Sequence, residues 1–374
     1  MDFIDLSAQQ KLIREKIEKR IKNVLDHGQY IMGPEVFELE ENLKSYLNVK
    51  HCISCSSGTD ALLMPLMAKS IGAGDAIITT SFSYIATAEV ISLLGATPIF
   101  CDIYPKTFNL DPNRLEEAYD KAVLEGLKPK AIISVDLFGL PARYRLISKF
   151  AKEKKLFLLE DAAQGFGGKI GKRRACTFGD VSATSFFPAK PLGGYGDGGA
   201  IFTNNDELAE KMRSIRVHGG GLDKYDNIRL GLNGRLDTLQ AAILIEKLKI
   251  FDEEISKRNE IAKIYSNNLS SNFISPYIPN NYMSSWAQYS VLLKSKKERV
   301  KIVKALSEKG IPSMIYYKIP LHLQKVFKYL GYKIGDLPKS ENISNRILSL
   351  PMHPYLKRSD QAFIIDTLKL LSHD

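Results

Sequence analysis

The stretch SFFPAKPLGGYGDGGA, residues 185–200, places one lysine, Lys190, between an aromatic run and a loop rich in glycine. Two prolines flank Ala189-Lys190 and stiffen the backbone, while the glycines let another group approach it closely. Most lysines of the chain fit an ordinary surface position, but a lysine at a strand end in this frame is less usual. If the amine of Lys190 is partly desolvated, its pKa falls and it becomes a usable nucleophile and base.

Short apolar runs of the kind that form buried strands alternate with helical patterns through the first two thirds of the chain. The expected strands are residues 51–55, 76–80, 97–101, 130–135, 156–160, 181–187 and 199–204. The expected helices are residues 7–26, 35–47, 59–69, 84–94, 112–123, 142–152 and 205–214. This alternation predicts an α/β fold with a mainly parallel central sheet, in which ligands bind at the carboxyl ends of the strands.

The pattern changes near residue 236, where one long helical stretch runs to residue 269. A chain of 374 residues is too long for one ordinary compact core. We therefore predict a large α/β domain over residues 1–246 and a smaller C-terminal α+β domain over residues 247–374. In the smaller domain we expect strands at 287–294 and 312–319 and helices at 296–310 and 359–371.

The bulk composition narrows the class of protein and of partner. A hydrophobic fraction of 44% and a charged fraction of 25% are typical of soluble globular proteins. The N-terminus lacks the apolar core of a signal peptide, and no later apolar run reaches membrane-spanning length, so we expect a cytoplasmic protein without a membrane partner. Cys52 and Cys55 fall on opposite faces of an expected strand, which favours free buried thiols over a metal or redox site.

The formal net charge of +10 favours anionic partners. The basic residues are spread along the chain, and no run of five or more of them suggests an arm that binds nucleic acid. A phosphorylated small molecule is therefore the better partner, and we expect no nucleic acid.

Polar residues that are hard to explain by packing follow two further expected strands. In SSGTDALL, residues 56–63, Gly58 and Thr59 open a helix whose first backbone N–H groups suit a phosphate. Taken alone, this stretch favours the alternative of an ordinary helix cap made by Thr59 or Asp60. In DAAQGFGG, residues 161–168, Asp161 follows a strongly apolar strand and needs a partner that is charged or a strong donor. Gln164 lies three residues further on, so both side chains could reach one ligand; here too a helix cap is the alternative.

A phosphate cradle, a buried aspartate and a constrained lysine form the set that pyridoxal 5′-phosphate requires, namely an anion site, an acid for the ring nitrogen and an amine for the Schiff base. In this order and at these strand ends, the three motifs resemble those of fold-type I pyridoxal-phosphate enzymes, and among them the DegT-like nucleotide-sugar aminotransferases. The resemblance extends from GQYIMGPEVFELE near the start to SLPMHPYL near the end of the chain.

The resemblance implies roles for single residues. Lys190 forms the Schiff base with the cofactor, Asp161 pairs with its pyridine nitrogen, Gln164 lies against its ring and Tyr84 stacks on it. The phosphate binders are Gly58, Thr59, Ser185 and, from a neighbouring subunit, Asn233. The resemblance therefore also implies a homodimer whose active site lies at the subunit interface.

The resemblance also implies the reaction. Related enzymes in which a histidine replaces the lysine carry out dehydration, whereas the lysine at position 190 indicates amino transfer. The amino donor is expected to be glutamate, which leaves its nitrogen on the cofactor, and a keto sugar then accepts that nitrogen.

The sugar expected from the resemblance is a UDP-linked 2-acetamido-3-keto hexose or hexuronic acid that serves lipopolysaccharide or O-antigen synthesis, and the amino group goes to C3. Arg235 and Tyr317 match substrate residues of such enzymes, and Tyr30 in HGQYIMG is expected to line the sugar pocket, where His27 is either a second lining residue or a structural histidine. Tyr316 stands where a histidine is expected, which keeps the uncharged sugar as an alternative to the uronic acid. For Arg235 an ion pair at a helix start is an alternative.

Two other functions stay open. A 4-keto nucleotide sugar could replace the 3-keto sugar as acceptor. A catalytically inactive protein that regulates or binds nucleic acid is the alternative from another class, because some proteins with this fold have been proposed as regulators. The intact lysine, aspartate and phosphate set argues against inactivity.

Overall fold

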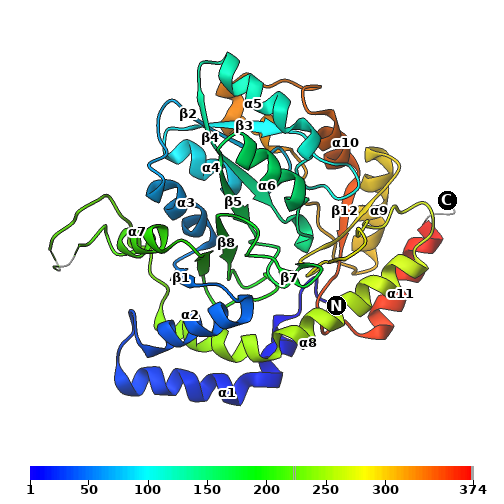
Figure 1. Cartoon of the computed structure of the whole chain (residues 1–374). Helices are drawn as coiled ribbons and strands as arrows, with labels where there is room; N and C mark the ends of the chain where they lie inside the picture. The colour runs from blue at the N-terminus through cyan, green and yellow to red at the C-terminus, as the bar shows by residue number, and fades with distance from the viewer. Residues whose placement is uncertain (222, 224, 372–374) are drawn as a thin grey trace.

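A seven-stranded sheet forms the centre of the molecule in the computed structural model, which describes residues 1–221, 223 and 225–371 (Figure 1). The order across the sheet is β1-β9-β8-β5-β4-β2-β3. These strands are β1 (His51–Cys55), β2 (Asp75–Thr80), β3 (Thr97–Cys101), β4 (Lys128–Val135), β5 (Phe157–Asp161), β8 (Val181–Ser185) and β9 (Gly199–Thr203). Strand β9 pairs antiparallel with β1 and β8, and the pairs from β8 to β3 are parallel, so the carboxyl ends of the other strands meet at one edge.

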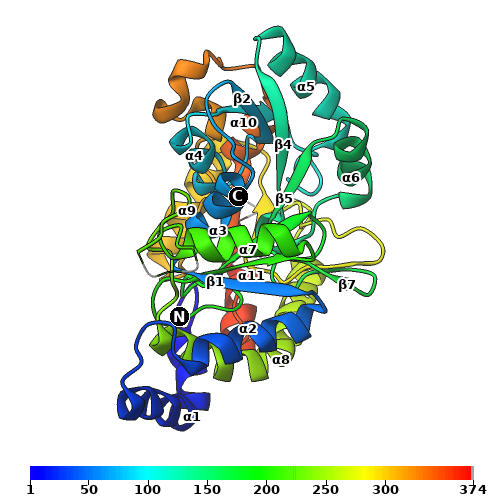
Figure 2. The ribbon, with the colours of Figure 1, turned by 60° about the vertical axis from the view of Figure 1, so that its left-hand side comes forward.

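Helices cover both faces of this sheet, because successive side chains of its strands point to opposite faces. Ile78 of β2 joins the core beneath α2, α5, α6 and α8, while its neighbour Ile77 joins the core beneath α3, α4 and α7. Figure 2 shows α5 and α6 on one side of the sheet and α3 and α4 on the other. The helices are α1 (Leu6–His27), α2 (Pro34–Leu47), α3 (Gly58–Ala68), α4 (Ala86–Leu93), α5 (Leu115–Leu124), α6 (Tyr144–Glu153), α7 (Asp206–Arg216), α8 (Thr238–Asn268), α9 (Lys296–Glu308), α10 (Pro338–Arg346) and α11 (Arg358–Leu371).

The C-terminal part of the chain builds a separate hydrophobic core, to which α9, α11 and the two-stranded sheet of β11 (Tyr289–Leu292) and β12 (Ile347–Leu350) contribute. A third, small sheet joins β10 (Tyr282–Met283) to β6 (Lys169–Ile170) and β7 (Arg173–Arg174). Residue 246, where we placed the domain boundary, lies inside α8, and the division into 1–246 and 247–374 stays a prediction.

The seven helices and seven strands expected in the first two thirds of the chain are all present, with ends shifted by a few residues. The strand expected at 312–319 is wrong, because that segment makes only an isolated bridge between Met314 and Ser349. All four cysteines are free and buried, and Cys52 and Cys55 join the cores on opposite faces of the sheet.

Within the described residues, no helix combines the length and the apolar character needed to cross a membrane. The same residues contain no group of three or more histidine, cysteine, aspartate or glutamate side chains placed to hold a metal ion.

Candidate active site

A cavity of about 640 Å³ opens at the carboxyl edge of the central sheet. It lies where the fold predicts a ligand, because β5 ends in Asp161 and β8 ends in Ser185 at this edge. Nine of the site residues expected from the sequence line it, namely Gly58, Thr59, Tyr84, Asp161, Gln164, Ser185, Lys190, Tyr316 and Tyr317. The fold thus brings together residues that are up to 259 positions apart in the sequence.

One end of the cavity holds the beginning of α3. The Ser57 side chain caps this helix by accepting the Asp60 N–H at 3.0 Å, so the cap is neither Thr59 nor Asp60. The first N–H groups of a helix have no partner within it, so those of Gly58 and Thr59 are able to donate to an anion. A Cβ atom at Gly58 would lie 2.6 Å from the Cβ of Ser185, so only glycine permits this close approach.

Lys190 and Asp161 influence each other across this cavity. Burial raises the pKa of Asp161 above its usual value, while hydrogen bonds from Thr87 and Ala163 and the charge of Lys190 oppose the rise. Burial lowers the pKa of the Lys190 amine, and the negative charge of Asp161 opposes the fall. A carboxylate and an amine with perturbed pKa values in one cavity are typical of an active site.

The carboxylate of Asp161 is held by two donors. The Thr87 hydroxyl donates to Oδ2 at 2.8 Å, and the backbone N–H of Ala163 donates to Oδ1 at 3.2 Å. The Ser83 and Thr87 hydroxyls lie 3.0 Å apart, which extends the chain of polar groups into the segment before α4. Sequence reasoning missed Thr87, and the only signal was its position within the segment SFSYIATAE.

Gln164 is fixed at both ends of its side-chain amide. Its Oε1 accepts the backbone N–H of Phe138 at 2.7 Å, and its Nε2 donates to the Tyr317 hydroxyl at 3.0 Å. Burial raises the pKa of Tyr317, so the phenol keeps its proton at neutral pH. Gln288 also lines the cavity, and sequence reasoning did not identify it.

Three expected site residues lie outside this lining. Asn233 and Arg235 line a neighbouring hollow of about 400 Å³, where Nε of Arg235 donates to Oδ1 of Asn233 at 3.0 Å. Asp197 lines both hollows and so connects them. Tyr30 is half exposed, and its carbonyl accepts the Thr238 N–H at the start of α8.

His27 makes the contact expected of a structural histidine. Its Nε2 lies 3.3 Å from both carboxylate oxygens of Glu35 in α2, and it does not line the cavity that holds Lys190.

The geometry of this cavity agrees with the comparisons with known proteins. The profile of the DegT/DnrJ/EryC1/StrS aminotransferase family matches residues 11–369. The chain belongs to this family. The expected aminotransferase activity is therefore confirmed, and so is fold-type I.

Curated relatives of this aminotransferase align over nearly their whole length. The UDP-2-acetamido-2-deoxy-3-oxo-D-glucuronate aminotransferase of Pseudomonas aeruginosa is 46% identical over 95% of this chain and 96% of its own. A pleiotropic regulatory protein of Geobacillus stearothermophilus is 40% identical over 98% of this chain and 97% of its own. The UDP-N-acetyl-3-dehydro-alpha-D-glucosamine 3-aminotransferase of Acidithiobacillus ferrooxidans is 35% identical over 99% of this chain and 98% of its own.

Solved structures share the fold of this aminotransferase. A family member from Brucella abortus superposes with a TM-score of 0.96 at 48% identity and covers 100% of both chains. NtdA from Bacillus subtilis, solved with bound cofactor PMP, superposes with a TM-score of 0.89 at 30% identity and covers 100% of this chain and 83% of its own. The expectations of a pyridoxal-phosphate enzyme and of a nucleotide-sugar aminotransferase are confirmed.

Proposed function

We propose that this enzyme, in the cytoplasm, transfers an amino group from glutamate to C3 of a UDP-linked 2-acetamido-3-keto sugar that serves bacterial surface polysaccharide synthesis. The observation that carries the proposal is that Lys190 and Asp161 line one cavity together with the first residues of α3. The relatives from Pseudomonas aeruginosa and Acidithiobacillus ferrooxidans support the choice of sugar, because both are named for UDP-linked 3-oxo or 3-dehydro sugars with an acylated nitrogen.

The side chains of the cavity fit pyridoxal 5′-phosphate. The N–H groups of Gly58 and Thr59 suit its phosphate, and so does the Ser185 hydroxyl, whose oxygen already accepts the Phe187 N–H at 3.2 Å and whose proton stays available as a donor. Lys190 is the one lysine among the described residues that line the cavity, so its amine would hold the cofactor aldehyde. When bound, the cofactor supplies an electron sink for the bond that breaks at the amino-bearing carbon.

Asp161 and Lys190 then have separate tasks. The Thr87 and Ala163 donors and the charge of Lys190 favour the ionised form of Asp161, which would hold a proton at the pyridine nitrogen. Nζ of Lys190, freed when an amino substrate binds, would take a proton from the substrate carbon and return it. Its pKa is lowered by burial, so a larger share of the amine is neutral and able to accept that proton.

Tyr84, Gln164, Tyr316 and Tyr317 are proposed to shape the ring and sugar parts of the cavity. Tyr84 is half exposed and free to cover a bound ring, whereas Gln164 and Tyr317 are held by their mutual hydrogen bond. The named substrates of the two relatives differ at C6, one being a glucuronate and the other a glucosamine. The uronic acid and the uncharged sugar are therefore both candidate acceptors.

We propose that the active site is completed in a homodimer, because Asn233 faces a hollow beside the Lys190 cavity and would reach the phosphate of a neighbouring subunit. The described residues between α7 and α8, among them Asn233, form a loop that extends away from the rest of the chain (Figure 1). It exposes 56% of Ile228 and 88% of Leu230, as a surface covered by a partner would. Arg235 and Tyr30 are proposed to contact the sugar in that assembled site.

Mixing two inactive variants tests this shared site. Lys190→Ala and Asn233→Ala each remove one half of the site, and we expect each variant to be nearly inactive alone. A mixed dimer carries one site with both native residues, so random exchange of subunits should restore about a quarter of wild-type activity. If Asn233 served the Lys190 of its own chain, no mixture would regain activity.

The substrate assay has two stages. The purified enzyme loaded with pyridoxal phosphate is mixed with glutamate, and its absorbance should change to that of the pyridoxamine form. UDP-linked 3-keto and 4-keto N-acetylhexosamines, with and without a C6 carboxylate, are then added, and the aminated product is identified by mass and NMR. Amination at C4 alone, or of none of these sugars, would reject the proposed acceptor.

A further inference from the structure

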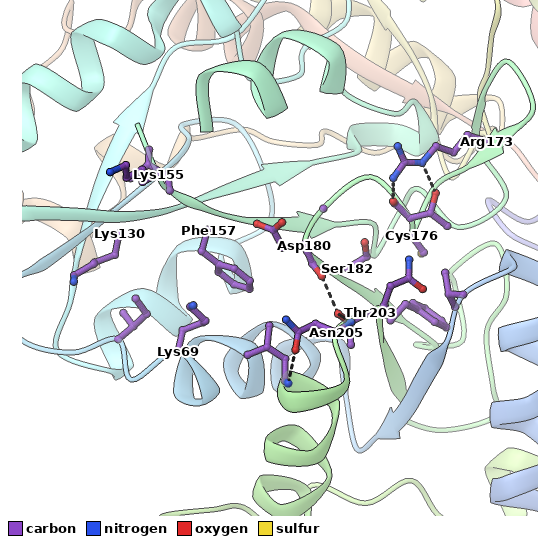
Figure 3. Close-up of a pocket in the computed structure, with 18 residues that line it drawn as sticks. Lys69, Lys130, Lys155, Phe157, Arg173, Cys176, Asp180, Ser182, Thr203 and Asn205 are labelled. Atoms are coloured by element: carbon purple, nitrogen blue, oxygen red, sulfur yellow. Dashed lines mark hydrogen bonds between the residues drawn. The ribbon is translucent and has the colours of Figure 1, made fainter. Parts of the chain in front are cut away.

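A second and larger hollow, of about 800 Å³, opens at the opposite edge of the central sheet, where β5 and β8 begin (Figure 3). It shares no lining residue with the cavity that holds Lys190. Among the described residues that line it, four side chains are basic and one, Asp180, is acidic. None of the residues to which we assign a role in amino transfer lines this hollow.

Three of the basic side chains come from separate segments of the chain. Lys69 ends α3, Lys130 lies in β4 and Lys155 follows α6, and Figure 3 shows them on one side of the hollow around the ring of Phe157. The Lys69 amine lies 5.5 Å from the centre of that ring. Like charges that line one hollow repel one another, so an anion bound there would lower the electrostatic energy.

The carboxylates of Asp180 and Glu207 near this hollow already have hydrogen-bond or ion-pair partners. Asp180 accepts the backbone N–H of Leu158 at 2.8 Å, and Glu207 is paired with Lys211 at 2.7 Å. This pairing is the main reason why the pKa of Glu207 is lowered, and the charge of Lys69 adds to the effect. In the part of the chain that the structure describes, Lys69, Lys130 and Lys155 form no ion pair. Their ammonium groups therefore remain available to a ligand.

Two asparagines add neutral donors to the same hollow. Oδ1 of Asn204 accepts the Lys50 N–H at 2.8 Å, and Oδ1 of Asn205 accepts the Leu208 N–H at 2.9 Å at the start of α7. Because a backbone donor occupies each oxygen, each amide is oriented and keeps its NH₂ group for another acceptor. Ammonium and NH₂ groups without competing acceptors are what a phosphate requires.

We propose that this hollow is a second ligand site, distinct from the catalytic cavity, that binds a small phosphorylated anion of the nucleoside diphosphate class. Its volume lies within the range of about 300–1,000 Å³ that small-molecule sites occupy. The three lysines meet the phosphate charge, the Asn204 and Asn205 amides donate hydrogen bonds to phosphate oxygens, and the hollow has room for an attached nucleoside.

Calorimetric titration of the enzyme loaded with pyridoxal phosphate tests the site, because the cofactor then fills the catalytic phosphate position. Pyrophosphate, UDP and inorganic phosphate are titrated separately at constant ionic strength, so that the phosphate and nucleoside contributions are separated. The triple variant K69Q/K130Q/K155Q should bind pyrophosphate at least tenfold more weakly. It should also lose one of the two UDP-binding events of the wild type, because the acceptor part of the catalytic cavity still binds UDP. The variant K69R/K130R/K155R keeps the charge and should retain binding.

A matched control removes three positive charges elsewhere. Lys296, Lys297 and Lys301 are exposed in and beside the first turns of α9, and K296Q/K297Q/K301Q should bind as the wild type does. The variant N204D/N205D keeps both acceptors for the backbone while it replaces the NH₂ donors, so it should weaken binding without uncapping α7.

Three outcomes would overturn the proposal. The first is the absence of pyrophosphate binding by the wild type, and the second is unchanged pyrophosphate binding by the K69Q/K130Q/K155Q variant. The third is an equal loss of pyrophosphate binding in the K296Q/K297Q/K301Q control. A crystal of the loaded enzyme soaked with UDP should show the diphosphate beside Lys69, Lys130 and Lys155. Density for UDP at the catalytic cavity alone would also reject a second site.

Discussion

The hydroxyl of Thr87 in α4 donates a 2.8 Å hydrogen bond to Oδ2 of Asp161 at the end of β5. This contact joins a helix on one face of the sheet to the carboxylate that we assign to the cofactor nitrogen. Because burial raises the pKa of Asp161, its ionised form depends on such donors. Thr87 therefore acts through Asp161 as a positioning residue.

We expect Thr87→Val to lower the rate of the half-reaction with glutamate by roughly 10- to 150-fold, because a hydrogen bond to a charged group contributes about 1.5–3 kcal/mol. Single-turnover spectra that follow the loss of the pyridoxal form measure this rate. Thr87→Ser keeps the hydroxyl and should stay near wild type. A valine variant with an unchanged rate would show that the Ala163 donor alone is sufficient.

The pairing of Gln164 with Tyr317 joins the strand-end loop of the large sheet to the C-terminal part of the chain. We expect Gln164→Ala to reduce kcat/KM more than Tyr317→Phe, because the alanine also leaves the Phe138 N–H without its acceptor. A double-mutant cycle on kcat/KM should give a coupling energy of about 1 kcal/mol. Additive losses would mean that the bond does not contribute to catalysis.

The fold was predictable because its signal is local. Runs such as HCISC and LFLLE are mostly apolar, as strands buried on both faces are, and helical patterns of ordinary length separate them. The segment 312–319 has the composition of a strand, but within the described residues it finds a partner only at Met314. Strand formation there depends on a neighbouring strand edge, which composition does not reveal.

The site residues likewise fall into those that the sequence could predict and those that it could not. Lys190, Asp161 and Gly58 stand beside strand ends within motifs of glycine and proline, so their chemistry could be inferred from neighbours in the sequence. Thr87 and Gln288 do not lie in a glycine or proline motif beside a strand end, and each becomes a site residue only through the way the chain folds. The place of Asn233 in an active site depends on an assembly that one chain does not contain.

His353 makes stability depend on pH. Burial and the charge of Arg258 lower its pKa to about 4 from an ordinary 6.5, while Asp5 and Asp2 oppose the shift. The folded pKa is depressed, so the unfolded chain takes up a proton first as the pH falls. The contribution of neutral His353 to the free energy of unfolding is fully present above pH 6.5. It is lost, by roughly 3 kcal/mol in all, as the pH falls to about 4.

We therefore expect His353→Gln to flatten the decline of stability between pH 7 and pH 4.5, as measured by urea unfolding at each pH. His218 is exposed, and His218→Asn serves as the control that should keep the slope of the wild type. A glutamine variant whose stability falls as steeply as that of the wild type would place the responsible proton on another group.

The pKa of Lys190 can be read from the reaction of the cofactor-free enzyme with pyridoxal phosphate, because only the neutral amine attacks the aldehyde. Burial lowers this pKa, so the association rate should rise with pH and reach half its maximum below the ordinary lysine value of 10.5. Asp161 is the group that raises the pKa of Lys190, and Asp161→Asn should move the midpoint to lower pH. Asp197 lines the same cavity, but it is not among the groups that shift the pKa of Lys190. Asp197→Asn should therefore leave the midpoint unchanged. If Asp161→Asn moved the midpoint upward, the two groups would not be the electrostatic partners on which the assignment of this cavity depends.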